Sequence, residues 1–168
     1  MSGGEPLMQD RFVIRLLGAA KAMDVHTALE TNGYLGERLS DDELEKIDLI
    51  LLGLKTWTPE RHLHLTGKDI TPTLEFALRL SRLQRKIWVR FVLVPGLTDD
   101  PENIDEIARF AADLGVVERV EVLPFHQLGR YKWQELGLNY TLNDIQAPTP
   151  AMLERACEQF RKVGLKAH

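Results

Sequence analysis

The residues whose chemistry is easiest to assign are two cations, a pair of histidines and one cysteine. Lys55 and Arg90 fall in or after apolar runs, at expected strand ends, where a cation can meet a carboxylate or can simply lie along the surface with its charge in water. His62 and His64 form an HxH pair that suggests a metal ligand, but no acidic or thiol partner stands nearby at ligand spacing. We therefore predict no metal site there. Cys157 is the only cysteine, which excludes an internal disulfide and any site built from several thiolates of this sequence.

Composition narrows the classes of partner. The formal net charge is -4 and the pI is near 5.7, so no excess of Lys and Arg favours nucleic acid or anionic lipid. The first residues lack the layout of a signal peptide, and no run is long and apolar enough to span a membrane. The sequence predicts a cytoplasmic protein with one domain over residues 1–168 and with neither nucleic acid nor membrane as a partner.

The elements that must position these residues alternate between strand and helix. Apolar runs predict four strands, over residues 25–31, 48–55, 87–95 and 117–125. Helical spacing and capping residues predict five helices, over residues 11–23, 40–47, 71–84, 100–115 and 149–164. Residues 127–146 are polar and aromatic and predict a long loop with one helical turn. This alternation predicts an α/β fold with a parallel sheet, too small for a closed barrel and bare at one edge unless another polypeptide covers it.

Ordered motifs place the sequence near a known family. Ser2-Gly3-Gly4-Glu5-Pro6-Leu7 resembles the GGE motif of the radical S-adenosylmethionine superfamily. Later blocks resemble the pyruvate formate-lyase activating enzymes, which are glycyl radical enzyme activases of that superfamily, almost end to end. These blocks are Thr31-Asn32-Gly33, Leu54-Lys55, His62 with Leu65-Thr66-Gly67, Val89 to Gly96, and Leu123 to Gly129 with Lys132-Trp133. The resemblance implies a partial (β/α) TIM-like barrel of the radical SAM type with its site at the C-terminal ends of the strands.

The resemblance also implies a cofactor and the residues that hold it. In the family, a CxxxCxxC loop binds a [4Fe-4S] cluster, and one iron chelates S-adenosylmethionine. Glycines in the GGE motif would let the backbone approach this cofactor, and the glutamate would hydrogen-bond its ammonium group. A solvated turn is the alternative for a Gly-Gly-Glu near a terminus, and a core position is the alternative for His126. By resemblance, the cofactor-binding residues are Gly3, Gly4, Glu5, Glu30, Thr31, Lys55, Arg90 and His126.

The long loop supplies a candidate for partner binding. Arg130, Tyr131, Lys132 and Trp133 form an aromatic and basic cluster of the kind that anchors interfaces. We assign it to docking of a glycyl radical enzyme, with packing of the loop on its own barrel as the alternative.

Two positions depart from the family pattern. Glu30 and Gly53 stand where the family commonly has aspartates that help hold a monovalent cation near the cofactor. Glu30 keeps the charge, but Gly53 removes one, which puts cation binding and cofactor affinity in doubt.

The cluster loop has no counterpart in these 168 residues, which start at the GGE motif. We expect that the chain alone lacks catalysis, and we assign no catalytic residue. Three hypotheses follow: a C-terminal part of an activase truncated at its N-terminus, a cluster-free module that docks a glycyl radical enzyme, or one half of a split activase completed by another polypeptide.

Overall fold

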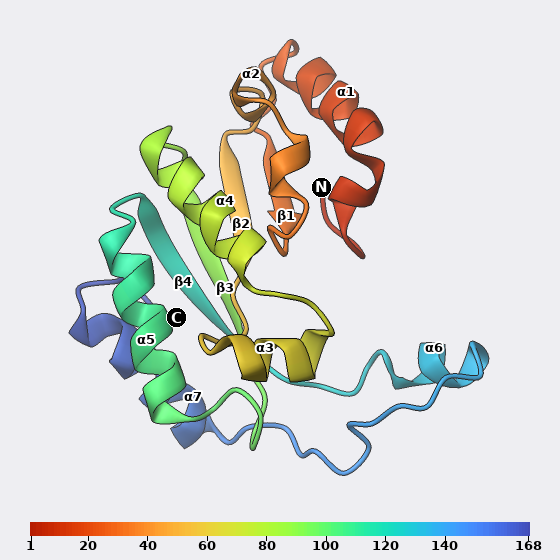
Figure 1. Ribbon diagram of the computed structural model, residues 1–168, viewed down its shortest axis with the longest axis vertical. Coiled ribbons are helices and arrows are strands. Elements are labelled where there is room, and N and C mark those ends of the chain that lie inside the picture. Colours follow the sequence, from red (N-terminus) through yellow and green to blue (C-terminus); the bar gives the residue numbers. More distant parts are fainter.

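A computed structural model describes all residues 1–168 and shows an open, four-stranded parallel sheet (Figure 1). The strands are β1 (Ala28–Thr31), β2 (Leu49–Gly53), β3 (Ile87–Leu93) and β4 (Val117–Pro124). They lie side by side in chain order, β1-β2-β3-β4. The prediction of a partial α/β barrel with four parallel strands is confirmed.

Helices connect the strands, and α4 and α5 pass in front of the sheet in Figure 1. None of the helices has the length and apolar character needed to cross a membrane. The α-helices are α1 (Asp10–Lys21), α2 (Asp41–Leu44), α3 (Pro59–Thr66), α4 (Thr71–Arg82), α5 (Pro101–Asp113), α6 (Arg130–Glu135) and α7 (Pro150–Lys162), with short 3₁₀ turns η1 (Pro6–Gln9) and η2 (Gly36–Arg38).

The two faces of the sheet differ in burial. Along β3, residues 87, 89, 91 and 93 are buried, whereas the residues between them are half-buried. Phe91 contacts Phe160 of α7 with ring centroids 5.7 Å apart, so the buried face is the one that the helices cover. The apolar run at 48–55 predicts a strand covered on both faces; this is wrong, because Leu51 and Gly53 lie on the half-open face. That face is free to carry polar side chains.

Capping residues set most helix starts as predicted. Ser40 and Glu43 form the reciprocal capping box, with distances of 3.2 and 2.9 Å. Asp100 and Thr149 accept hydrogen bonds at the starts of α5 and α7. The predicted cap at Thr71 is wrong: its N–H and hydroxyl donate to Asp69, two residues earlier, and Thr71 is already helical. The helix α3 was not predicted at all.

Both sheet edges carry main-chain pairing from a chain end. At β1, the Met1 amine donates to the Ala28 carbonyl at 2.7 Å, and the Glu30 N–H donates to the Met1 carbonyl at 2.9 Å. At β4, the N–H groups of Val120 and Val122 donate to the carbonyls of Lys166 and His168, each at 2.8 Å. The predicted bare edge is therefore limited to β1, where a single residue pairs with the strand.

Candidate functional site

The half-open face of the sheet and the N-terminal segment enclose a cleft of about 320 Å³. Its lining includes seven of the eight residues assigned to cofactor binding by resemblance. The lining residues are Ser2, Gly3, Gly4, Glu5, Glu30, Thr31, Asn32, Gly53, Lys55, Arg90, Val92 and Leu123. They come from the N-terminal segment, all four strands and the loops that follow β1 and β2.

His126 is the one assigned residue outside this lining. It follows β4, is exposed, and its Nδ1 accepts the Leu128 N–H at 3.4 Å. The structure does not bring it to the cleft.

Glu5 holds the end of β1 in place. Its Oε1 accepts from the Thr31 hydroxyl at 2.9 Å and from the Leu7 N–H at 3.0 Å. Its Oε2 accepts from the Asn32 N–H at 2.9 Å. Three donors on one carboxylate fix the cleft wall between the N-terminal segment and the turn after β1.

Arg90 lies between two carboxylates on the cleft floor. Sequence reasoning put it at a strand end; this is wrong, because it is central in β3, in register with Gly53 on one side and Glu121 on the other. Its Nη1 pairs with Glu30, and its Nε lies 3.2 Å from Glu121 Oε2. That Nε is buried and lacks a well-aligned hydrogen-bond acceptor. Because Gly53 has no side chain, the guanidinium can reach across β2 to Glu30.

Lys55 is the cleft's free cation. It follows β2, is exposed and forms no ion pair within the chain. Arg90, by contrast, is neutralised by its neighbours. Of the two cations predicted to meet a ligand carboxylate, Lys55 is therefore the one whose charge is available.

His62 belongs to α3, which sequence reasoning missed, and it is 8% exposed. Its Nδ1 lies 3.2 Å from the Thr56 hydroxyl. Burial, and then the positive charge of Lys55, lower the pKa of His62 below its usual value. The imidazole is accordingly neutral at pH 7. His64 is exposed, and no three or more His, Cys, Asp or Glu side chains are grouped so that they could hold a metal ion.

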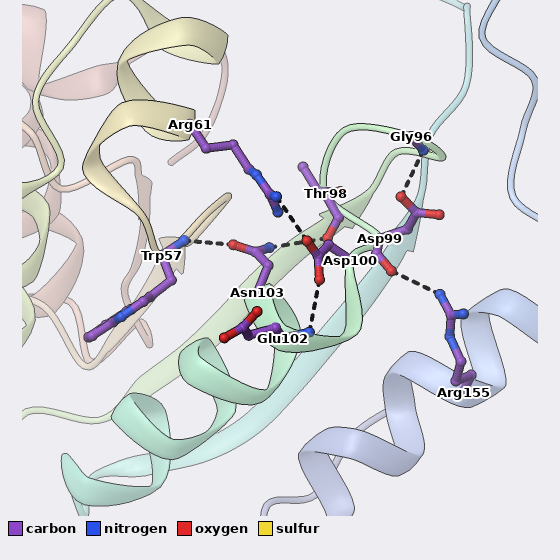
Figure 2. Close-up of polar contacts among 9 residues, drawn as sticks. All are labelled: Trp57, Arg61, Gly96, Thr98, Asp99, Asp100, Glu102, Asn103 and Arg155. Carbon is purple, nitrogen blue, oxygen red and sulfur yellow. Dashed lines mark hydrogen bonds and ion pairs between the residues drawn. The ribbon is translucent and has the colours of Figure 1, made fainter.

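A polar network fixes the loops beyond β2 and β3 (Figure 2). Asn103 accepts from the Trp57 N–H at 2.8 Å and donates to the Thr98 carbonyl at 3.1 Å. Arg61 of α3 pairs with Asp100 at 2.8 Å. Asn103 is buried, and sequence reasoning missed it because one asparagine in the first turn of a helix carries no pattern. The network ties α3 to the start of α5 and so sets where His62 lies.

The loop after β4 projects from the body as an arm with α6 near its far end (Figure 1). No residue of α6 is buried, and Tyr131 and Trp133 are 54% and 44% exposed. Gln127 closes the base of the arm, because its Nε2 lies within 3.1 Å of the carbonyls of Leu142, Asn143 and Ile145. The arm therefore presents Arg130, Tyr131, Lys132 and Trp133 away from the sheet.

Comparison with known proteins assigns the family. The sequence profile of the Radical SAM superfamily matches residues 1–120. The chain is 39% identical over 167 residues to pyruvate formate-lyase 1-activating enzyme of Escherichia coli K12, across 98% of this chain and 68% of that protein. It is 40% identical over 172 residues to pyruvate formate-lyase-activating enzyme of Staphylococcus aureus USA300, across 99% of this chain and 67% of that protein.

Among solved structures, a domain of pyruvate-formate lyase-activating enzyme from Bacteroides vulgatus ATCC 8482 superposes with a TM-score of 0.82 at 24% identity. The match covers 100% of this chain and 95% of that domain, and at this identity it supports the fold. Sequence profile, relatives and fold agree with the motifs that line the cleft. The chain belongs to the radical SAM superfamily.

Proposed function

We propose that residues 1–168 form one partial-barrel domain of an activating enzyme for a glycyl radical enzyme of the pyruvate formate-lyase type, and that it binds S-adenosylmethionine and docks the partner. The observation that carries this proposal is that one cleft gathers seven of the eight residues assigned to the cofactor by resemblance. The names of the relatives support the choice of partner.

The cleft fits S-adenosylmethionine, whose methionine end carries an ammonium and a carboxylate. Gly3 and Gly4 have φ values of +104° and +59°, and a Cβ on either would meet no atom within 4 Å. Their backbone is thus open to a ligand and is suited to glycine. In our proposal Lys55 binds the carboxylate, the one lone pair left free on Glu5 Oε2 receives the ammonium, and Glu30 accepts from ribose hydroxyls.

The iron–sulfur cluster of the superfamily does not fit the residues present. Cys157 is buried in α7, where burial raises the pKa of its thiol. One inert thiol cannot hold a cluster of four irons. In the family, the cofactor is the source of the 5'-deoxyadenosyl radical that takes hydrogen from a glycine of the partner; we assign no such step to residues 1–168.

Replacing Lys55 with methionine is expected to weaken S-adenosylmethionine binding about tenfold, because the only unpaired cation on the cleft is lost. Titration calorimetry on the 168-residue chain measures this directly. Lys162→Met, at an exposed position at the end of α7, is the matched control and should bind like the unaltered chain. Equal affinities in all three proteins would contradict the placement of the carboxylate.

Replacing Trp133 with alanine is expected to weaken docking to pyruvate formate-lyase about tenfold, since exposed aromatic residues commonly anchor interfaces. Surface plasmon resonance with immobilised pyruvate formate-lyase is the measurement. Phe12→Ala, which removes an exposed aromatic ring from α1, should leave docking unchanged. An equal loss in both variants would argue against the arm. Docking without any binding of S-adenosylmethionine would favour the cluster-free module.

A further inference from the structure

A second chamber of about 400 Å³ adjoins the cleft. The two share Glu5, Asn32, Gly53 and Lys55 on their common wall. The rest of the chamber is built by the turn after β1, by α3 and the segment that follows it, and by one residue each of η1 and α4. The side chains that give it its character are Tyr34, Lys55, His62, Leu65, Thr66 and Lys68.

The charge of this chamber is positive. Lys55 and Lys68 both line it, and neither forms an ion pair within the chain. The ammonium of Lys68 lies 5.6 Å from the centroid of the Tyr34 ring, which holds the charge at the wall. Glu5 is the only carboxylate of the lining, and three donors already occupy it. Asp69, just outside, accepts from Thr71.

A ring nitrogen of the buried residue His62 adds a directional contact. His62 is more than nine-tenths buried, and its Nδ1 is taken by Thr56. Its Nε2 has no hydrogen-bond partner in the chain, although His62 lines the chamber. In the tautomer in which the Thr56 hydroxyl donates to Nδ1, Nε2 carries the proton and can donate to an anion. The pKa of His62 is lowered first by burial and then by Lys55, while Asp69 acts in the opposite direction to a smaller extent, which agrees with a positive charge that is only partly offset at this place.

We propose that this chamber is a binding site for a carboxylate group carried on a short organic body. Two ammonium groups and one imidazole N–H complement the carboxylate oxygens, and Leu35 and Leu65 supply apolar wall for the body. The volume suits a small acid or the side chain of an aspartate or glutamate of a polypeptide. The site shares Lys55 with the one assigned to S-adenosylmethionine, so the two carboxylates would compete for that ammonium, whereas His62 and Lys68 line this chamber alone. The existence of the site does not depend on the proposed function.

The test is a titration of the 168-residue chain with sodium acetate at constant ionic strength, followed by the NMR signals of His62 and Tyr34. We expect saturable shifts with a dissociation constant on the order of millimolar. Acetamide, which has the same shape and no charge, should give none. Lys68→Gln should weaken acetate binding about fivefold, the effect of one partly screened charge pair, whereas Lys162→Gln should not change it.

Two blocked peptides then identify the source of the carboxylate. Acetyl-Gly-Glu-Gly-amide binding more tightly than acetate would assign the site to an acidic side chain, with the glutamine peptide as the control. Acetate binding more tightly than the glutamate peptide would assign it to a free acid. The proposal is overturned by equal shifts with acetate and acetamide, by an unchanged affinity in Lys68→Gln, or by the absence of saturation.

Discussion

Replacing Gly36 with alanine is expected to lower the free energy of unfolding by about 3 kcal/mol, at the upper end of what overpacking costs. A Cβ at this position would lie 2.2 Å from two atoms of the Phe76 ring and 2.8 Å from its Cβ. Phe76 is 3% exposed and belongs to the hydrophobic core, so any movement of its ring disturbs its packing there. Gly36 begins η2, four residues after Asn32, whose N–H donates to Glu5. The substitution therefore strains a segment that directly follows the cleft wall. Urea denaturation of the chain measures the loss.

A second substitution separates this contact from a general effect of alanine. Phe76→Leu alone should destabilise by about 1–2 kcal/mol through the smaller side chain. In Gly36→Ala/Phe76→Leu, the total loss should fall below the sum of the single losses, because the leucine vacates the space that the new methyl group needs. Additive losses would show that Gly36 matters for another reason. Gly18→Ala is the matched control: Gly18 is inside α1, its added Cβ would meet only the Lys46 side chain at 3.4 Å, and the change should stabilise by about 0.5–1 kcal/mol.

Local chemistry explains why so much of the fold could be predicted. The side chains of Ser40, Glu43, Asp100 and Thr149 accept from N–H groups within the same few residues, and Pro101 and Pro150 occupy first helical positions where no N–H is needed. The signal is therefore contained in the sequence. The helix α3 was not predicted because its sequence, PERHLHLT, has no apolar stripe. Of its residues, only His62 is buried. A proline after Thr58 was the available signal.

Most residues of the site could be predicted from the sequence, but the contacts between them could not. Motif resemblance named Glu5, Glu30 and Arg90, and the structure places all three on the cleft. It did not reveal that Glu5 is held by three donors or that Arg90 is paired on both sides, because those contacts depend on the register of neighbouring strands. Glu121 was not predicted, although the alternation along β4 puts it on the half-open face of the sheet, where it pairs with Arg90. His126 was assigned to the cofactor by its position in a motif, but it does not line the cleft.

Replacing Arg90 with methionine is expected to lower the free energy of unfolding by about 2 kcal/mol, because Glu30 and Glu121 would lose the cation between them. The side chains of these carboxylates are 35% and 24% exposed, so water offsets part of the loss, which should be smaller than for a fully buried pair. Methionine keeps most of the side-chain volume over Gly53 and avoids opening a cavity. S-adenosylmethionine binding should weaken as well, since Glu30 would no longer be held at the cleft floor.

The control for Arg90→Met is the same substitution at Arg109, whose pair with Glu106 lies on the surface of α5 at side-chain exposures of 57% and 36%. Its loss should stay within about 0.5 kcal/mol. Adding Glu30→Gln to Arg90→Met removes the carboxylate that has lost its partner and should restore about half of the lost stability. Glu121 would still have Arg119, 3.9 Å away, as a partner. Equal losses at positions 90 and 109, or no recovery in the double variant, would mean that the three-residue pairing across the sheet is only a surface contact. Recovery of stability without recovery of S-adenosylmethionine binding would show that the charge of Glu30, and not merely its position, is needed at the cleft.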